Sequence, residues 1–427
     1  MPRELTTRIV QDPSDGFRFL PHLTTQAPDL LVSFDVLGGG RIRARMSGSA
    51  VPALHGTEHK VDLHATPDEV HGAAARLRAR WRTQFVDFQP VDDLGRSVQG
   101  RRRPYATSAD LSAEPEEELR RIVADLARSG ESLLFSTLLR GDDEPTKIFR
   151  NSLRSALSQE GLRVRFDSEL HLPWPLLCTT TEDSTVPATL QVLFTRFLGH
   201  RHQIEHTSDA YAWIGPPGAA HERPSVSLNH DVHVGSATRA DEVAKALAAG
   251  TDYTVRTTYE ELVRDLEKPE LDEQLMYFWC HGEFVGNPPE LPTLVIKLTD
   301  GAPIDGHTVR ELRANYRHGC FRPLVLLNAC HTGVSAASAD RAFLGSMLIE
   351  HGAQGVLGPQ IAMPQAFAAE YALEFVTRYL RGAATAGQIT HELARHFAAR
   401  YRNPLGFAYG LHCGMDARLD RTRGGEA

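Results

Sequence analysis

The order of apolar and polar positions along the 427-residue chain predicts a mixed α/β protein. Residues 30–37 and 41–46 alternate in polarity on either side of three glycines, a pattern typical of a β-hairpin. Thr66 is expected to cap a helix, because Pro67 takes its first position and Glu69 the capping-box position, with apolar side chains at helical spacing beyond. The chain therefore begins with an α+β unit.

We place this small N-terminal unit, whose role the sequence does not reveal, at residues 1–105, because residues 100–104 resemble an exposed linker. A second domain is expected over residues 106–420. Beyond Pro224 short apolar strands alternate with helical segments, which predicts a mostly parallel central sheet flanked by helices on both faces. The strands are expected at 226–228, 253–257, 275–279, 324–328 and 355–357, and the helices near 240–249, 259–266, 342–351, 365–380 and 386–399.

Composition narrows the class of protein without identifying it. With 41% hydrophobic and 23% charged residues, the chain is expected to bury a large core. Its net charge of −8 argues against a general nucleic-acid-binding surface, which needs concentrated Lys and Arg. Neither a secretory leader nor an apolar stretch of membrane-spanning length is visible, and five scattered cysteines do not suggest a disulfide framework. We therefore expect a cytoplasmic protein without membrane contact.

Two of the predicted core strands end in residues that can do chemistry together. His281 follows the apolar run that starts at Leu275, and Cys330 follows the run that starts at Leu324. Ligands of open α/β sheets bind beyond the carboxyl ends of the strands, so both residues should lie at one rim. A thiol needs a neighbouring base to become a thiolate at neutral pH, and imidazole has the nearest pKa. We predict His281 as general base and Cys330 as nucleophile.

Other residues are expected around this pair. The backbone amides of Gly282 and Cys330 are the natural donors to an oxyanion, since Gly282 lets the chain approach a substrate closely. Asn328 is assigned with Gly282 to oxyanion or substrate binding. If the substrate carries a basic side chain, an acidic pocket must receive it. The suppliers that the sequence offers are Glu283, Asp305, Glu370, Glu374 and Asp416.

Several polar residues have a plainer interpretation. Cys280 should point away from His281 into the core, by strand alternation, and Cys178, Cys320 and Cys413 are expected to be packing residues. His200, His202 and His206 could present two imidazoles on one helix face, but no further ligands complete a metal site, and we predict a solvated helix end without metal or cofactor. Asn229, His230, Asp231 and His233 follow a strand and either border the rim or form an ordinary turn.

The motifs around the predicted pair resemble those of the CHAT domain, a caspase-like and separase-like family of cysteine peptidases with a caspase-like fold. Residues 278–284, FWCHGEF, are similar to the family's His motif, and residues 326–333, LLNACHTG, to its Cys motif. The 49-residue separation of the two is also caspase-like. Residues 173–177, PWPLL, resemble an upstream family motif, with Pro175 where Glu is usual, and residues 403–409 resemble the last strand.

The resemblance implies a cysteine endopeptidase that cleaves a protein substrate encoded nearby, without a cofactor, after activation by a partner or small ligand. It also implies a role in bacterial defence or cell death, and it places Gln360, in the loop after the strand at residues 355–357, in the substrate pocket. Two alternatives stay open. The chain could be a catalytically silent scaffold for protein interaction, or its N-terminal unit could sense a ligand.

Overall fold

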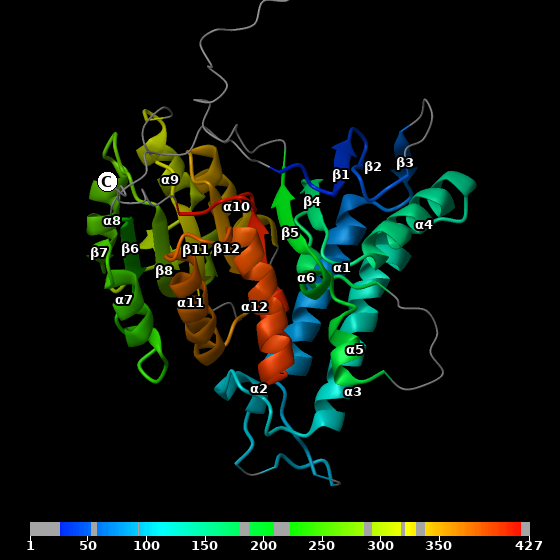
Figure 1. Cartoon of the computed structure of the whole chain (residues 1–427), viewed down its shortest axis with the longest axis horizontal. Coiled ribbons are helices and arrows are strands. Elements are labelled where there is room, and N and C mark those ends of the chain that lie inside the picture. The colour runs from blue at the N-terminus through cyan, green and yellow to red at the C-terminus, as the bar shows by residue number, and fades with distance from the viewer. Residues whose placement is uncertain are drawn as a thin grey trace, which may run out of the picture.

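The computed structural model describes residues 26–52, 58–92, 94–98, 100–179, 188–208, 223–285, 293–316, 321–329 and 338–419. Within these ranges a single thirteen-stranded sheet runs across the molecule (Figure 1). The strands are β1 Leu30–Leu37, β2 Arg41–Ser47, β3 His59–Leu63, β4 Arg163–Ser168, β5 Gln203–Thr207, β6 Ser225–His230, β7 Asp252–Arg256, β8 Leu275–Val285, β9 Thr293–Lys297, β10 Pro303–Ile304, β11 Leu324–Ala329, β12 Gly355–Pro359 and β13 Tyr409–His412.

The sheet consists of two parallel blocks joined by an antiparallel pair. In one block β7, β6, β8, β11 and β12 are parallel neighbours, and in the other β1, β4, β5 and β13 are. Strand β13 joins the blocks because it pairs antiparallel with β12 and parallel with β5. Antiparallel β2 and β3 extend one edge, and β9 and β10 pair with the second half of β8. The predicted mostly parallel α/β sheet is confirmed.

Helices cover both faces of the first block. The helices are α1 Pro67–Trp81, α2 Pro104–Thr107, α3 Glu116–Glu131, α4 Glu144–Ser158, α5 Leu190–Phe194, α6 Leu198–Arg201, α7 Ala240–Ala248, α8 Tyr259–Leu266, α9 Gly306–Arg313, α10 Ser338–Glu350, α11 Gln365–Tyr379 and α12 Ala386–Tyr401. Along β8, Tyr277 and Trp279 face the core that α7, α11 and α12 cover, whereas Met276 and Phe278 face the core under α8, α9 and α10. Burial on both faces explains why these strands are almost continuously apolar.

The N-terminal elements are as predicted but do not form a separate body. The hairpin is β1 and β2, and α1 begins with the complete Thr66–Glu69 capping box. Strand β1 pairs with β4 over residues 30–34, and α1 contributes Leu77 and Trp81 to the larger core. No break in the described sheet marks the expected boundary near residue 105, and a division into functional units there stays a prediction.

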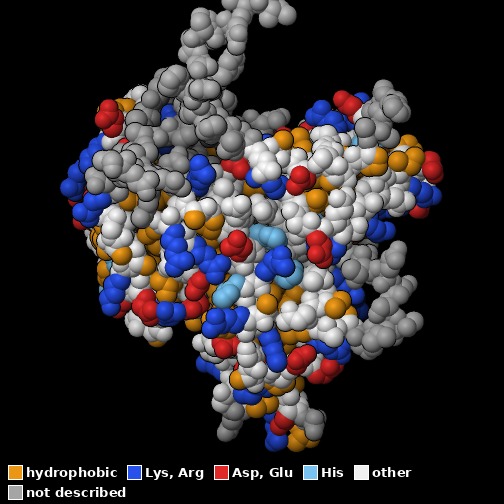
Figure 2. Space-filling view, viewed as in Figure 1, with side chains coloured by type: hydrophobic (Ala, Val, Ile, Leu, Met, Phe, Trp, Pro, Cys, Tyr) orange, Lys and Arg blue, Asp and Glu red, His pale blue; other side chains and the backbone are white. Residues whose placement is uncertain are grey.

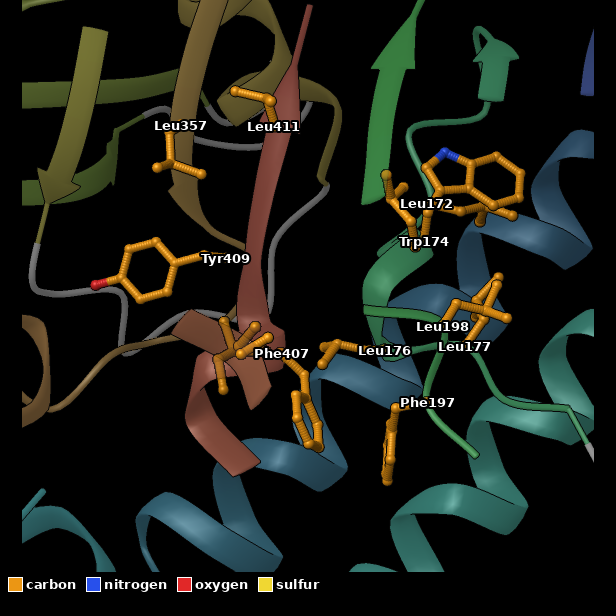
Figure 3. Close-up of a cluster of buried hydrophobic side chains, with 14 of the residues drawn as sticks. Leu172, Trp174, Leu176, Leu177, Phe197, Leu198, Leu357, Phe407, Tyr409 and Leu411 are labelled. Atoms are coloured by element: carbon orange, nitrogen blue, oxygen red, sulfur yellow. The ribbon is translucent and has the colours of Figure 1, made fainter. Parts of the chain in front are cut away.

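The PWPLL motif is packed between the two blocks. Residues Trp174–Leu176 form a short 3₁₀ helix, and the Trp174 indole stacks on Phe166 of β4 with ring centroids 4.0 Å apart. Figure 3 shows Leu176 and Phe407 facing each other across this core, with Phe197 below, and the Phe197 and Phe407 rings lie 5.1 Å apart. The motif therefore packs β4 and β5 against the segment that leads into β13.

Two local predictions are wrong. Residues Pro404–Ala408 form a 3₁₀ helix, so the last strand begins at Tyr409 rather than at residue 403. His202 and His206 do not share a helix face, because the chain leaves α6 at Arg201 and enters β5 at Gln203. Both imidazoles are buried rather than solvated. Pairing of β5 with β4 and β13 overrides the helical appearance of this sequence.

The described surface carries charges of both signs. On the face shown in Figure 2, Lys and Arg side chains lie among Asp and Glu side chains rather than gathering apart. Arg239, for example, pairs with both Glu242 and Glu370. Among the described helices, none has the length and apolar character needed to cross a membrane.

Candidate active site

The site is built where the parallel pairing of β8 with β11 ends. Strand β11 ends at Ala329, whereas β8 continues through His281 to Val285 instead of ending before His281 as expected. The two strands are parallel and in register, with Trp279 opposite Asn328 and Cys280 opposite Ala329. Parallel strands present their carboxyl ends at one edge of a sheet, where α/β proteins bind ligands. His281 follows Cys280 directly, while Cys330, the residue after Ala329, lies outside the described residues. The predicted base is therefore seen at this edge, and the structure gives the course of the chain up to the predicted nucleophile.

Gly282 brings β8 into close contact with the end of β11. A Cβ atom on Gly282 would lie 2.8 Å from the Cβ of Ala329, closer than two carbon atoms can pack. A larger residue would push the chain away from β11 at the position just before the predicted nucleophile. This contact gives a physical reason for glycine after His281, independent of the predicted oxyanion role, which stays a prediction.

His281 has an acidic neighbour. Its Nε2 lies 3.4 Å from Oδ2 of Asp231, which follows β6, the neighbour of β8 on the side away from β11. The His281 side chain is 37% exposed, whereas that of Asp231 is only 8% exposed. Lys297 of β9 is the register partner of His281 and forms an ion pair with Glu283. The imidazole is thus accessible, with a buried carboxylate beside it.

Sequence reasoning named the stretch containing Asp231 but could not choose between a rim position and turn chemistry. Both descriptions apply. Oδ1 of Asp231 accepts a hydrogen bond from the His233 amide at 2.9 Å, a typical Asx-turn contact, while Oδ2 faces His281. The usable signal was the position of Asp231 just after a core strand, the same signal that identified His281.

Asn328 has a structural task. It is fully buried, and its Nδ2 donates to the Ala368 carbonyl oxygen at 3.1 Å, while its Oδ1 accepts from the Tyr409 hydroxyl at 2.8 Å. These bonds connect β11 to α11 and to β13. The carboxamide therefore points into the protein, which leaves only the Asn328 backbone for the predicted substrate contact.

The remaining predicted pocket residues fall into two groups: Gln360 lines a pocket, and the predicted carboxylates do not. Gln360 lines a pocket beside Ala329, which also involves Leu327, Pro359 and His412 and has an empty volume of about 480 Å³ including the solvent at its mouth. Glu283 is not among the residues that line this pocket. The other carboxylates considered for an acidic pocket have local partners, since Glu370 pairs with Arg239, Glu374 with Arg378, Asp416 with Arg163, and Asp305 caps α9.

The described cysteines belong to the core. Cys280 lies beneath α8 and α10 among Met276 and Phe278, on the face opposite Tyr277 and Trp279, as strand alternation predicts. Burial raises the pKa of the Cys178 thiol and that of the Cys413 thiol, which disfavours the reactive thiolate. Cys320 and Cys330 lie outside the described residues. Among the described side chains, no three His, Cys, Asp or Glu residues are arranged to hold a metal ion.

Comparison with known proteins gives the family of this α/β protein. The model of the CHAT domain family matches residues 151–395, more than half of the chain. The chain therefore belongs to the CHAT domain family.

Individual relatives are distant. A protein named "Probable protease" from Vitiosangium sp. (strain GDMCC 1.1324) is 27% identical over 135 residues, which cover 32% of this chain and 17% of the relative. Two crystal structures of the Saccharomyces cerevisiae separase–securin complex align with 90% of this chain and 30% of the matched chain, at 10% identity and a TM-score of 0.46. The chain thus spans less than a third of the length of each relative.

Proposed function

We propose that this chain is a cysteine endopeptidase in which His281 is the general base and Cys330 the nucleophile. One observation carries the proposal. The last described residue of β11, Ala329, lies opposite Cys280, and Gly282 contacts Ala329 directly. Cys330 is bonded to Ala329, and consecutive Cα atoms are about 3.8 Å apart. The position of Ala329 therefore supports a thiol at the edge of the sheet at which His281 is exposed.

The chemistry follows from these two groups. His281 takes the proton from the Cys330 thiol, and the thiolate attacks the carbonyl carbon of the scissile peptide bond. Backbone amides of Gly282 and Cys330 stabilise the oxyanion. The tetrahedral intermediate expels the amine, which receives the proton from His281, and an acyl-enzyme thioester remains. His281 then deprotonates water, which hydrolyses the thioester and restores the thiol.

The context of the reaction is proposed from the family and from the name of the Vitiosangium relative. We infer a protein substrate encoded near this chain, activation by a partner or small ligand, and a task in bacterial defence or cell death in the cytoplasm. The pocket beside Ala329 supports a refinement, since Leu294, Leu327 and Pro359 make it largely apolar. An uncharged side chain fits it better than a basic one.

Labelling with a peptidyl chloromethyl ketone tests the nucleophile. Wild-type protein should take up one equivalent at Cys330, located by peptide mapping, because Cys178, Cys280 and Cys413 are buried. Cys330→Ala and His281→Ala should lose the label, whereas the matched variant Cys320→Ala should keep it. New peptide termini in lysate treated with wild type but not with Cys330→Ala would identify the substrate. Equal labelling of Cys330→Ala, or cleavage by it at the wild-type rate, would refute the assignment.

A further inference from the structure

We infer that Asp231 is a positioning residue that holds the His281 imidazole by Nε2, so that Nδ1 is the nitrogen that takes the proton from the nucleophile. The inference rests on the proposed function. A neutral imidazole carries its proton on one nitrogen only, and a carboxylate can accept a hydrogen bond but cannot donate one. The carboxylate of Asp231, 3.4 Å from Nε2, therefore favours the tautomer in which Nε2 is protonated. In that tautomer the lone pair is on Nδ1.

The carboxylate is held in place before any substrate arrives. The Asp231 amide donates to the Trp279 carbonyl oxygen at 3.0 Å, and Oδ1 accepts from the His233 amide at 2.9 Å. Both bonds leave Oδ2 directed at His281. Because one of them runs to β8, two residues before His281, the carboxylate and the imidazole share a backbone frame.

The loop that follows Asp231 is packed against the same strand. The Trp279 indole donates from Nε1 to the Val234 carbonyl oxygen at 3.1 Å. Gly235 adopts φ +85° and lies so close to this indole that a Cβ would meet it at 2.8 Å. The Val232 amide donates to the Thr299 hydroxyl at 3.0 Å. A loop fixed at three points is suited to orienting a catalytic group, since positioning requires a supporting shell.

The other titratable groups near His281 contribute little net charge beside its ring. Lys297 of β9 lies opposite His281, but its charge is compensated by an ion pair with Glu283 on the same strand as His281. His230 precedes Asp231, and burial lowers its pKa, which favours the neutral form. Asp231 is thus the carboxylate that is both buried and next to the imidazole. Its negative charge favours the imidazolium that forms when the thiol loses its proton.

The first test measures His281 without requiring catalysis. In protein carrying Cys330→Ala, NMR titration should show that His281 loses its proton at lower pH in Asp231→Asn than with Asp231 in place, because the variant lacks the carboxylate charge beside the ring. Asp231→Glu should restore most of the shift. The matched control is Asp252→Asn at the amino end of β7, which removes one exposed charge more than about 20 Å away and should leave the pKa unchanged. An unchanged pKa in folded Asp231→Asn would overturn the proposal.

A second measurement needs no change at Asp231. In Cys330→Ala protein above the pKa of His281, ¹⁵N chemical shifts of the two ring nitrogens should show the proton on Nε2. A ring protonated mainly on Nδ1 would refute the assigned role, even if Asp231→Asn failed to fold.

Kinetics then separate this inference from the proposed function. With a cleavable substrate, Asp231→Asn should lower kcat by at least about tenfold with little change in KM, and shift the acid limb of the kcat/KM profile to lower pH. Normal cleavage and an unshifted profile in this variant would refute the role of Asp231 while leaving His281 and Cys330 in place. If wild type neither cleaves nor takes up the electrophile although the pKa and tautomer are as expected, the proposed function fails and the pairing stands.

Discussion

The contact between Gly282 and Ala329 gives the sharpest prediction about the assembly of the site. Gly282→Ala would place a methyl group 2.8 Å from the Ala329 Cβ, whereas carbon atoms pack at about 3.5–4.0 Å. Neither Cβ can rotate away, so β8 at Gly282 and the end of β11 must separate by about 0.7–1.2 Å. Overpacking of this kind costs about 1–3 kcal/mol of stability, and a displacement of about 1 Å at a catalytic pair can cost about 10²-fold in rate.

Backbone strain does not contribute to this effect, because Gly282 is not among the residues with positive φ. Gly38→Ala is a matched control, since φ at Gly38 is not positive either and a Cβ there would meet nothing within 4 Å. Urea denaturation would measure the free energy of unfolding, and the rate of electrophile labelling would measure the reactivity of the proposed catalytic pair. Gly282→Ala that is as stable and as rapidly labelled as Gly38→Ala would show that this contact does not set the geometry.

Two further predictions concern the core behind the site. Asn328→Ala should lower the free energy of unfolding by about 2–5 kcal/mol in urea titrations, because the Tyr409 hydroxyl and the Ala368 carbonyl oxygen lose a buried partner; a loss below about 1 kcal/mol would contradict the bracing role. Acid should also destabilise the protein, because burial and a neighbouring imidazole hold the pKa of His206 and that of His412 at about 3, below the value of about 6.5 in the unfolded chain. The contribution of these two histidines to the free energy of unfolding is complete above about pH 6.5 and falls by about 1.4 kcal/mol per pH unit per histidine toward pH 3. Equal unfolding free energies at pH 7.5 and 5.5 would count against their burial as neutral rings.

The fold was predictable from sequence where local chemistry and tertiary packing agree. The Thr66–Glu69 capping box defines the start of α1, and the apolar runs ending at Cys280 and Ala329 are buried strands because both faces of the sheet are covered. The rule that parallel strands present their carboxyl ends at one edge was enough to associate His281 with the end of β11.

Predictions failed where long-range pairing decides the structure. Nothing local in residues 203–207 distinguishes a strand from a helix continuing α6, and the pairing with β13, some 200 residues later, decides the outcome. The direction of the Asn328 carboxamide likewise depends on Tyr409 and Ala368, which lie far along the chain. The sequence showed that Asp231 follows a strand, but it could not show that Asp231 lies beside His281. The pairing of β6 with β8 brings the two residues together.

The place of β13 in the sheet has a consequence for biosynthesis. Residues 409–412 come after every other described strand in the order of translation, yet they occupy the seam between β12 and β5. A nascent chain that has reached only residue 408 holds two parallel blocks with unpaired edges where β13 belongs, and unpaired edges invite association with other chains. Because β13 also carries Tyr409, the hydroxyl donor to Asn328, β11 gains this hydrogen bond only after Tyr409 has been synthesised. The framework around the proposed site therefore closes only once residues 409–412 have been synthesised.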